Sequence, residues 1–108
     1  MIEAVYNRTY HKLTVKGHSG SAEKGQDLIC AAASILVYTL ANAVIGADLE
    51  SKLRNRPTVR LEEGDAEISY APLHSYRNVM LLISDSICAG FDILAQKYPE
   101  YVKYTVVG

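Results

Sequence analysis

Two pairs of short stretches in this chain alternate hydrophobic and polar residues. The first pair is Ile2 to Asn7 and Tyr10 to Lys16, and the second pair is Thr58 to Glu63 and Ala66 to Ala71. Alternation with a period of two is typical of a strand that buries one face. Because only a short polar turn separates the members of each pair, the pattern predicts two β-hairpins.

Two longer segments carry apolar residues at helical spacing. The first follows Asp27, a residue type that caps helix N-termini, and we expect it to run to about Ile45, with Gly46 ending it. The second has its apolar residues at steps of three and four, and we expect Ser75 to cap it and Lys97 to lie near its end.

A last short stretch alternates again and predicts a closing strand. Pro99 ends the second helix, and Val102, Tyr104 and Val106 then share one face. The resulting order, β-β-α-β-β-α-β, contains hairpins and no repeated βαβ unit. It predicts an α+β fold with a mainly antiparallel sheet, and 108 residues are enough for one domain, spanning residues 1–108.

Charge and composition narrow the classes of function. The 11 basic and 12 acidic residues are spread along the chain, so we expect no direct contact with nucleic acid. The N-terminus lacks the basic region and cleavage site of a secretory signal, which favours a cytoplasmic location. The uncharged stretch from Leu28 to Ala47 is long enough to span a bilayer, but its many alanines and its polar residues favour a core helix over a membrane span.

The two cysteines fall in different predicted helices and differ in their expected surroundings. A cytosolic pair is more often free than bridged, and the spacing of Cys30 and Cys88 is not that of metal ligands, so we expect neither a disulfide nor a metal or other cofactor. Cys88 lies in the middle of its helix and is expected to be a buried small hydrophobe. Cys30 lies in a first helical turn, where free amides and the helix dipole favour an anion.

Cys30 is the better candidate for a nucleophile, with His18 as its partner. The helix dipole contributes on the order of 0.3 to 1 kcal/mol, too little to hold a thiolate without an imidazolium nearby. From the spacing alone, however, a solvated loop histidine is the better interpretation of His18. Asp27 could orient the imidazole, but a capping role is the better interpretation of this residue.

Polar residues form one stripe along the first predicted helix, at steps of three and four: Asp27, Cys30, Ser34, Tyr38 and Asn42. On a helix expected to be buried, such a stripe indicates either a cleft at its N-terminal end or ordinary hydrogen bonds to neighbouring elements. For the last three residues we favour the hydrogen-bonding interpretation, because buried polar groups are usually satisfied in this way.

Two segments, Gly17-His18-Ser19-Gly20 and Gly25 to Ser34, closely resemble the signature of the ribosomal-processing cysteine protease family, called Prp. The second predicted helix and the segment from Lys97 to Val102 resemble the same family. The resemblance implies a homodimeric bacterial endopeptidase. Its substrate would be the large-subunit ribosomal protein numbered twenty-seven, from which it would remove an N-terminal extension by cutting after a pair of aromatic residues.

The resemblance also implies roles for individual residues. Cys30 is similar to the family's nucleophile and His18 to its general base, while Gly17, Asp27 and Ser34 match positions that shape the site. Ser19 and Ser21 stand where members of the family often have alanine and a bulkier residue.

The glycines from Gly17 to Gly25 suggest a loop that is mobile when empty and brings the histidine to the cysteine only when substrate binds. Two other classes of function stay open at this point. One is a non-catalytic peptide-binding module that accompanies ribosome assembly, and the other is a cytosolic redox sensor built on Cys30.

Overall fold

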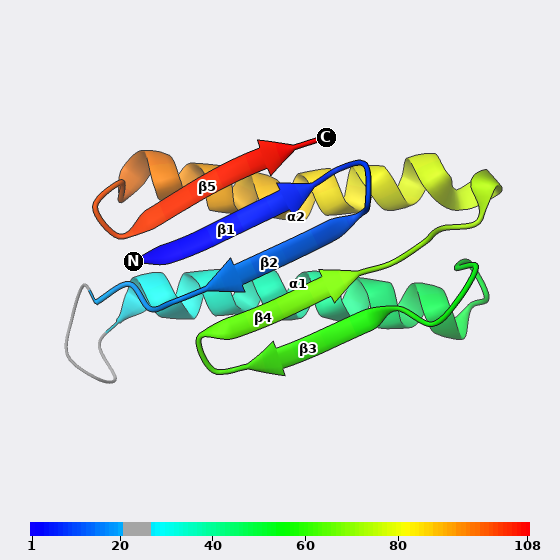
Figure 1. Ribbon diagram of the computed structural model, residues 1–108, viewed down its shortest axis with the longest axis horizontal. Helices are drawn as coiled ribbons and strands as arrows, with labels where there is room; N and C mark the ends of the chain where they lie inside the picture. The colour runs from blue at the N-terminus through cyan, green and yellow to red at the C-terminus, as the bar shows by residue number, and fades with distance from the viewer. Residues whose placement is uncertain (21–26) are drawn as a thin grey trace.

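A single five-stranded sheet carries both long helices on one of its faces (Figure 1). The computed structural model describes residues 1–20 and 27–108. The elements follow the predicted order and have these bounds: β1 Ile2–Asn7, β2 Lys12–Lys16, α1 Leu28–Leu49, β3 Thr58–Glu62, β4 Asp65–Ser69, a 3-10 turn at His74–Tyr76, α2 Arg77–Lys97 and β5 Val102–Val107.

The strands lie in the order β3-β4-β2-β1-β5. Three neighbouring pairs are antiparallel, including both predicted hairpins, so the expectation of an α+β fold with a mainly antiparallel sheet is confirmed. The fourth pair, β1 with β5, is parallel and makes the sheet mixed. The physical reason lies in the connection: α2 carries the chain back across the sheet, so that β5 starts at the same end as β1 (Figure 1).

The core lies between the sheet and the two helices. On α1 the buried residues recur at helical spacing, from Ile29 through Val37 and Val44 to Ala47, and Phe91 is fully buried on α2. The opposite face of the sheet is polar, and its cross-strand pairs include neighbours of opposite charge such as Glu3 with Lys16. One face of the sheet therefore holds the core and the other meets solvent.

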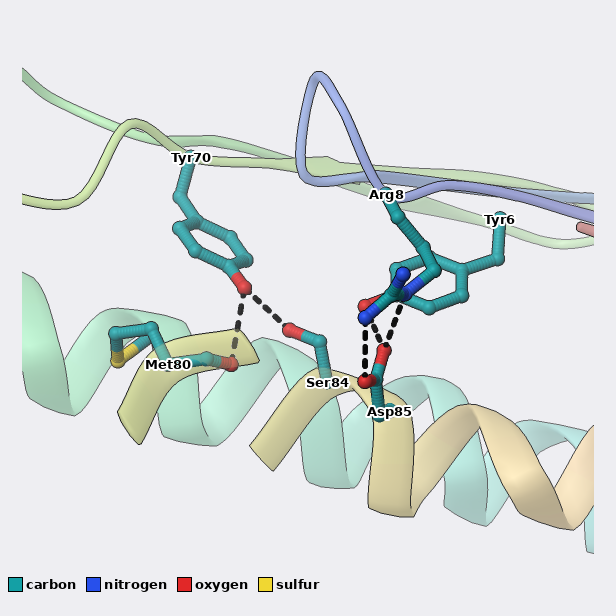
Figure 2. Close-up of polar contacts among 6 residues, drawn as sticks. All are labelled: Tyr6, Arg8, Tyr70, Met80, Ser84 and Asp85. Carbon is teal, nitrogen blue, oxygen red and sulfur yellow. Dashed lines mark hydrogen bonds and ion pairs between the residues drawn. The ribbon is translucent and has the colours of Figure 1, made fainter. Parts of the chain in front are cut away.

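Polar side chains tie α2 to the sheet at two places (Figure 2). The Tyr70 hydroxyl lies within hydrogen-bonding distance of Ser84 and donates to a backbone carbonyl of α2 at 3.1 Å. Asp85 accepts from the Tyr6 hydroxyl at 2.8 Å and from two nitrogens of Arg8 at 3.0 and 3.1 Å. The Arg8 guanidinium, by hydrogen bonding, holds the pKa of the Asp85 carboxyl below its usual value.

Two predicted helix ends were wrong. Gly46 does not end α1, which continues to Leu49, because Ala47 still packs against the core and extends the buried face by another turn. Ser75 does not cap α2, since it lies inside the 3-10 turn and α2 begins at Arg77 without a side-chain cap. In both places packing and chain direction override the local preference of a single residue.

Both long helices are long and apolar enough to cross a membrane by length and composition. The core helices of soluble proteins meet the same criterion, which makes it weak evidence for a membrane span. In this structure each helix packs one face against the sheet (Figure 1). This arrangement agrees with the interpretation of Leu28 to Ala47 as a core helix.

Candidate active site

A cleft of about 450 Å³ lies at the end of the sheet where α1 begins and the β3–β4 hairpin turns. Its walls are the first half of α1 and the hairpin from Leu61 to Ala66, and Ile2 and Val15 of the sheet line it as well. His18 and Cys30 both line this cleft. Two residues that are 12 positions apart in the sequence thus share one concave surface.

Asp27 places Cys30 in the first turn of α1, as the sequence predicts. The Asp27 carboxylate accepts a hydrogen bond from the backbone N–H of Cys30 through Oδ1 at 2.9 Å, and its carbonyl accepts from the N–H of Ala31 at 3.1 Å. This is the geometry of an N-cap, which satisfies amides that the helix itself leaves open. The Cys30 side chain is partly buried at the edge of the cleft.

Among the residues that the structure describes, Ser19 makes the polar contacts to the Cys30 sulfur. Its backbone N–H donates to Sγ at 3.3 Å, and its hydroxyl oxygen lies 3.5 Å from Sγ. The same hydroxyl donates to Oδ2 of Asp27. Sequence reasoning assigned Ser19 no part in the site, because an isolated loop serine carries no signal of the partner onto which the loop will fold.

His18 is exposed, and its imidazole lies against the turn of the β3–β4 hairpin. A Cβ added at Gly64 would come within 2.6 Å of the imidazole Nε2, so the absence of a side chain at this position makes room for the ring. Among the described residues, no hydrogen bond joins the imidazole to the sulfur of Cys30. In this structure His18 and Cys30 share a cleft without forming a hydrogen-bonded pair.

Gly17 fixes the start of the loop that carries His18. Its φ of +93° lies in the range that favours glycine, and a Cβ at this position would come within 2.2 Å of the backbone oxygen of Met1. Its N–H donates to the carbonyl of Gly64 at 2.9 Å, and the terminal amino group of Met1 donates to the carbonyl of His18. The close approach to Met1 accounts for the glycine at position 17.

The last three members of the polar stripe, Ser34, Tyr38 and Asn42, are exposed, so the expectation that they are buried and need hydrogen-bond partners was wrong. The buried face of α1 is the apolar one, and the stripe lies outside it. Ser34 and Tyr38 line the cleft, as the alternative interpretation of the stripe requires, and Asn42 is not among the lining residues.

Ser21 and Gly25 lie outside the described residues, and with them most of the loop that we expect to move on substrate binding.

Both cysteines are free. Cys88 is fully buried, as expected, and burial raises the pKa of its thiol to about 12. A thiol with this pKa is protonated at neutral pH, in agreement with the expectation that Cys88 is a buried small hydrophobe.

A family model described as cysteine protease Prp matches residues 1–103 of this chain. A ribosomal processing cysteine protease Prp from Staphylococcus aureus is 23% identical over 87 residues, which are 81% of this chain and 77% of the relative. The protein of the same name from Bacillus subtilis is 41% identical over 49 residues, which are 42% of this chain and 44% of the relative.

Solved structures show the same fold. The crystal structure of an essential ribosomal processing protease Prp from S. aureus, in complex with a covalently linked product peptide, matches with a TM-score of 0.77 and 20% identity. The match covers 98% of this chain and 99% of that one. A second structure of the S. aureus protease, in complex with a substrate peptide, matches with a TM-score of 0.67 and 19% identity, covering 97% and 96% of the two chains.

Proposed function

Because the chain belongs to the cysteine protease Prp family and is thus a cysteine peptidase, we propose that it cleaves the N-terminal extension from the large-subunit ribosomal protein numbered twenty-seven. The observation that carries the proposal is that Cys30, at the N-terminus of α1, and His18 line one cleft. The relatives are named ribosomal processing cysteine proteases, which supports the choice of substrate.

The shape and the lining of the cleft support a peptide substrate that is cut after aromatic residues. Val37, Tyr38 and Leu61 line the cleft beyond Cys30, and they offer apolar surface to an aromatic side chain. Tyr38 and Leu61 are also solvent-exposed, so a bound aromatic ring would remove their surface from water. The S. aureus relative has been crystallised with a substrate peptide and with a covalently linked product peptide, which agrees with this class of ligand.

The proposed mechanism uses the two cleft residues in sequence. The thiol proton of Cys30 passes to the imidazole of His18, and the thiolate attacks the carbonyl carbon of the scissile peptide. The imidazolium then protonates the departing amine, and water, activated by the neutral imidazole, hydrolyses the thioester. Because His18 is exposed and rests against Gly64, its side chain has to turn toward the sulfur before the first of these steps.

The protein is also proposed to work as a homodimer in the cytoplasm. Both helices expose a stripe with steps of three and four on the side that does not face the sheet. On α1 the stripe is Leu28, Ala31, Ile35, Tyr38, Asn42, Ile45 and Leu49, and on α2 it is Val79, Leu82, Ser86, Ala89, Ile93 and Gln96. Such spacing is typical of a helix-packing seam, and a second copy of this chain offers a matching one.

The dimer can be tested by light scattering after gel filtration. Ile35→Glu places a charge in the middle of the α1 stripe and is expected to produce a monomer. Val5→Glu makes the same type of change on the outer face of the sheet and should leave the dimer intact. A monomeric parent protein at micromolar concentration, or a dimer that survives Ile35→Glu, would argue against this interface.

The cleavage proposal is tested with a peptide that spans the extension and the first residues of the mature ribosomal protein. Cleavage after the aromatic pair is expected, and Cys30→Ala and His18→Ala should each lower kcat/KM by at least about 10³-fold. Cys88→Ala is the same type of substitution at a cysteine outside the cleft, and this variant should retain activity. If the parent binds the peptide without cutting it, the alternative of a non-catalytic peptide-binding module is favoured.

A further inference from the structure

Ser19 combines three features that are unusual in a loop serine. Only 4% of its surface is exposed, its backbone N–H donates to the Cys30 sulfur at 3.3 Å, and its hydroxyl oxygen lies 3.5 Å from the same atom. Buried hydroxyls are normally satisfied, and the described partners of this hydroxyl include the proposed nucleophile and the carboxylate that caps its helix. Ser19 thus contacts the proposed reactive sulfur directly, through both its backbone and its side chain.

Ser19, Asp27 and Cys30 form a closed circuit of hydrogen bonds. The hydroxyl of Ser19 donates to Oδ2 of Asp27, while Oδ1 of Asp27 accepts from the backbone N–H of Cys30. The circuit closes between Sγ of Cys30 and the hydroxyl oxygen of Ser19, with the thiol as donor. Because the Asp27 carboxylate accepts hydrogen bonds from both the Ser19 hydroxyl and the Cys30 N–H, it fixes the position of this hydroxyl relative to the start of α1.

The direction of these bonds decides which form of the thiol the circuit favours. A carboxylate is a stronger acceptor than a sulfur atom, so the hydroxyl hydrogen of Ser19 is directed at Asp27. Toward the sulfur the hydroxyl therefore presents lone pairs. Lone pairs accept a hydrogen from a neutral thiol, whereas they repel the negative charge of a thiolate.

We propose that Ser19 is a positioning residue that holds the resting Cys30 in its protonated form through this hydroxyl, and that its backbone N–H then holds the thiolate. This inference rests on the proposed role of Cys30 as the nucleophile. When the thiol proton passes to His18, the bond to the Ser19 oxygen is lost and the N–H remains as a donor to the sulfur. One residue thus contacts the sulfur in both protonation states and lowers its reactivity until the thiol proton passes to the imidazole of His18.

The test is the pH dependence of Cys30 alkylation by iodoacetamide in the full chain, measured by intact mass. Ser19→Ala removes the hydroxyl and keeps the N–H, so its alkylation profile should move to lower pH, with a rate at pH 7 about 2- to 10-fold above that of the parent. Ser19→Thr keeps a hydroxyl and should restore the parental profile. Ser75→Ala, an exposed serine of the 3-10 turn, controls for loss of any hydroxyl and should also match the parent.

An unchanged or slower rate in Ser19→Ala would overturn the proposal, as would an accelerated rate in Ser19→Thr. A second measurement needs no change at position 19: the Raman S–H stretching band of Cys88→Ala, in which Cys30 is the remaining thiol. A band shifted by hydrogen bonding at pH 7 is expected, and an absent or unshifted band would contradict the proposal. Neither readout involves peptide cleavage, so a failure of the proposed protease function would be seen separately.

Discussion

Gly17→Ala tests whether the close approach of the loop to the chain terminus positions the proposed general base. The substitution places a methyl group at a backbone φ of +93°, with its carbon 2.2 Å from the Met1 carbonyl oxygen. Real Cβ atoms essentially never come closer than 3.0 Å, so the backbone of the loop or of the terminus has to move by close to 1 Å. The next residue in the chain is His18, which moves with it.

Gly17→Ala is expected to lower the free energy of unfolding through two effects that can be separated. A non-glycine residue at positive φ costs roughly 1 to 2 kcal/mol, and overpacking against a backbone atom adds about 1 to 3 kcal/mol. Gly20→Ala is the matched control, because Gly20 has a φ of +66° and no atom of residues 1–20 or 27–108 lies within 4 Å of its added Cβ. It should show the first part alone, so Gly17→Ala is expected to be the less stable variant by about 1 to 3 kcal/mol.

Urea unfolding followed by tyrosine fluorescence measures both variants, since the chain has 8 tyrosines and no tryptophan. Peptide cleavage at 25 °C, where both variants should stay folded, measures the effect on the site. Displacement of a catalytic group by about 1 Å can lower the reaction rate on the order of 10²-fold. We therefore expect kcat/KM of Gly17→Ala to fall by roughly 10- to 100-fold. Equal unfolding midpoints in the two variants, together with unchanged cleavage, would refute the reasoning.

Three further predictions concern the contacts of α2. Asp85→Asn should lose about 1 kcal/mol at pH 7, a small value because the carboxylate is 38% exposed. Arg8 lowers the pKa of Asp85 in the folded state, so this stability is fully present above the pKa of the unfolded chain. The difference from the parent should begin to shrink below about pH 4 and vanish once the carboxyl is protonated in the folded state as well, and a difference independent of pH would be contrary evidence. Tyr70→Phe leaves the buried Ser84 without this partner and should lower the unfolding free energy by about 1 to 3 kcal/mol in urea titrations, whereas a neutral effect would argue against the contact. Alkylation of the native protein at pH 8 should add one label and leave Cys88 unmodified in a peptide map, because burial raises its pKa to about 12; rapid labelling of Cys88 would contradict its burial.

Local patterns predicted the elements and their order, because each depends on neighbouring residues. Asp27 caps α1 as predicted, since an N-cap involves only the next few amides. The predicted helix end at Gly46 was wrong because it does not depend on local residues alone. Whether a helix continues through a glycine depends on how the following turn packs against the core, and the sequence does not show this packing. The parallel pairing of β1 with β5 joins the two ends of the chain and has no local signal.

The candidate site was predictable only in its principal residues. His18 and Cys30 stand out by residue type and by position at element ends, and the structure brings both to one cleft. Ser19 and Gly64 contribute through contacts across the fold, one to the sulfur and one to the imidazole. A serine in a loop and a glycine in a hairpin turn are common, and nothing in the sequence indicates what will pack against them.

The central claim is that Cys30 acts as a nucleophile with His18 as its base, and covalent trapping tests it most directly. The probe is a chloromethyl ketone that carries the aromatic end of the extension peptide, and tandem mass spectrometry locates the adduct. We predict one adduct, on Cys30, formed at least about 10²-fold faster than with a free thiol and slowed to a similar degree in His18→Ala. Labelling at another residue, or a Cys30 rate that equals that of a free thiol and ignores His18→Ala, would contradict the account.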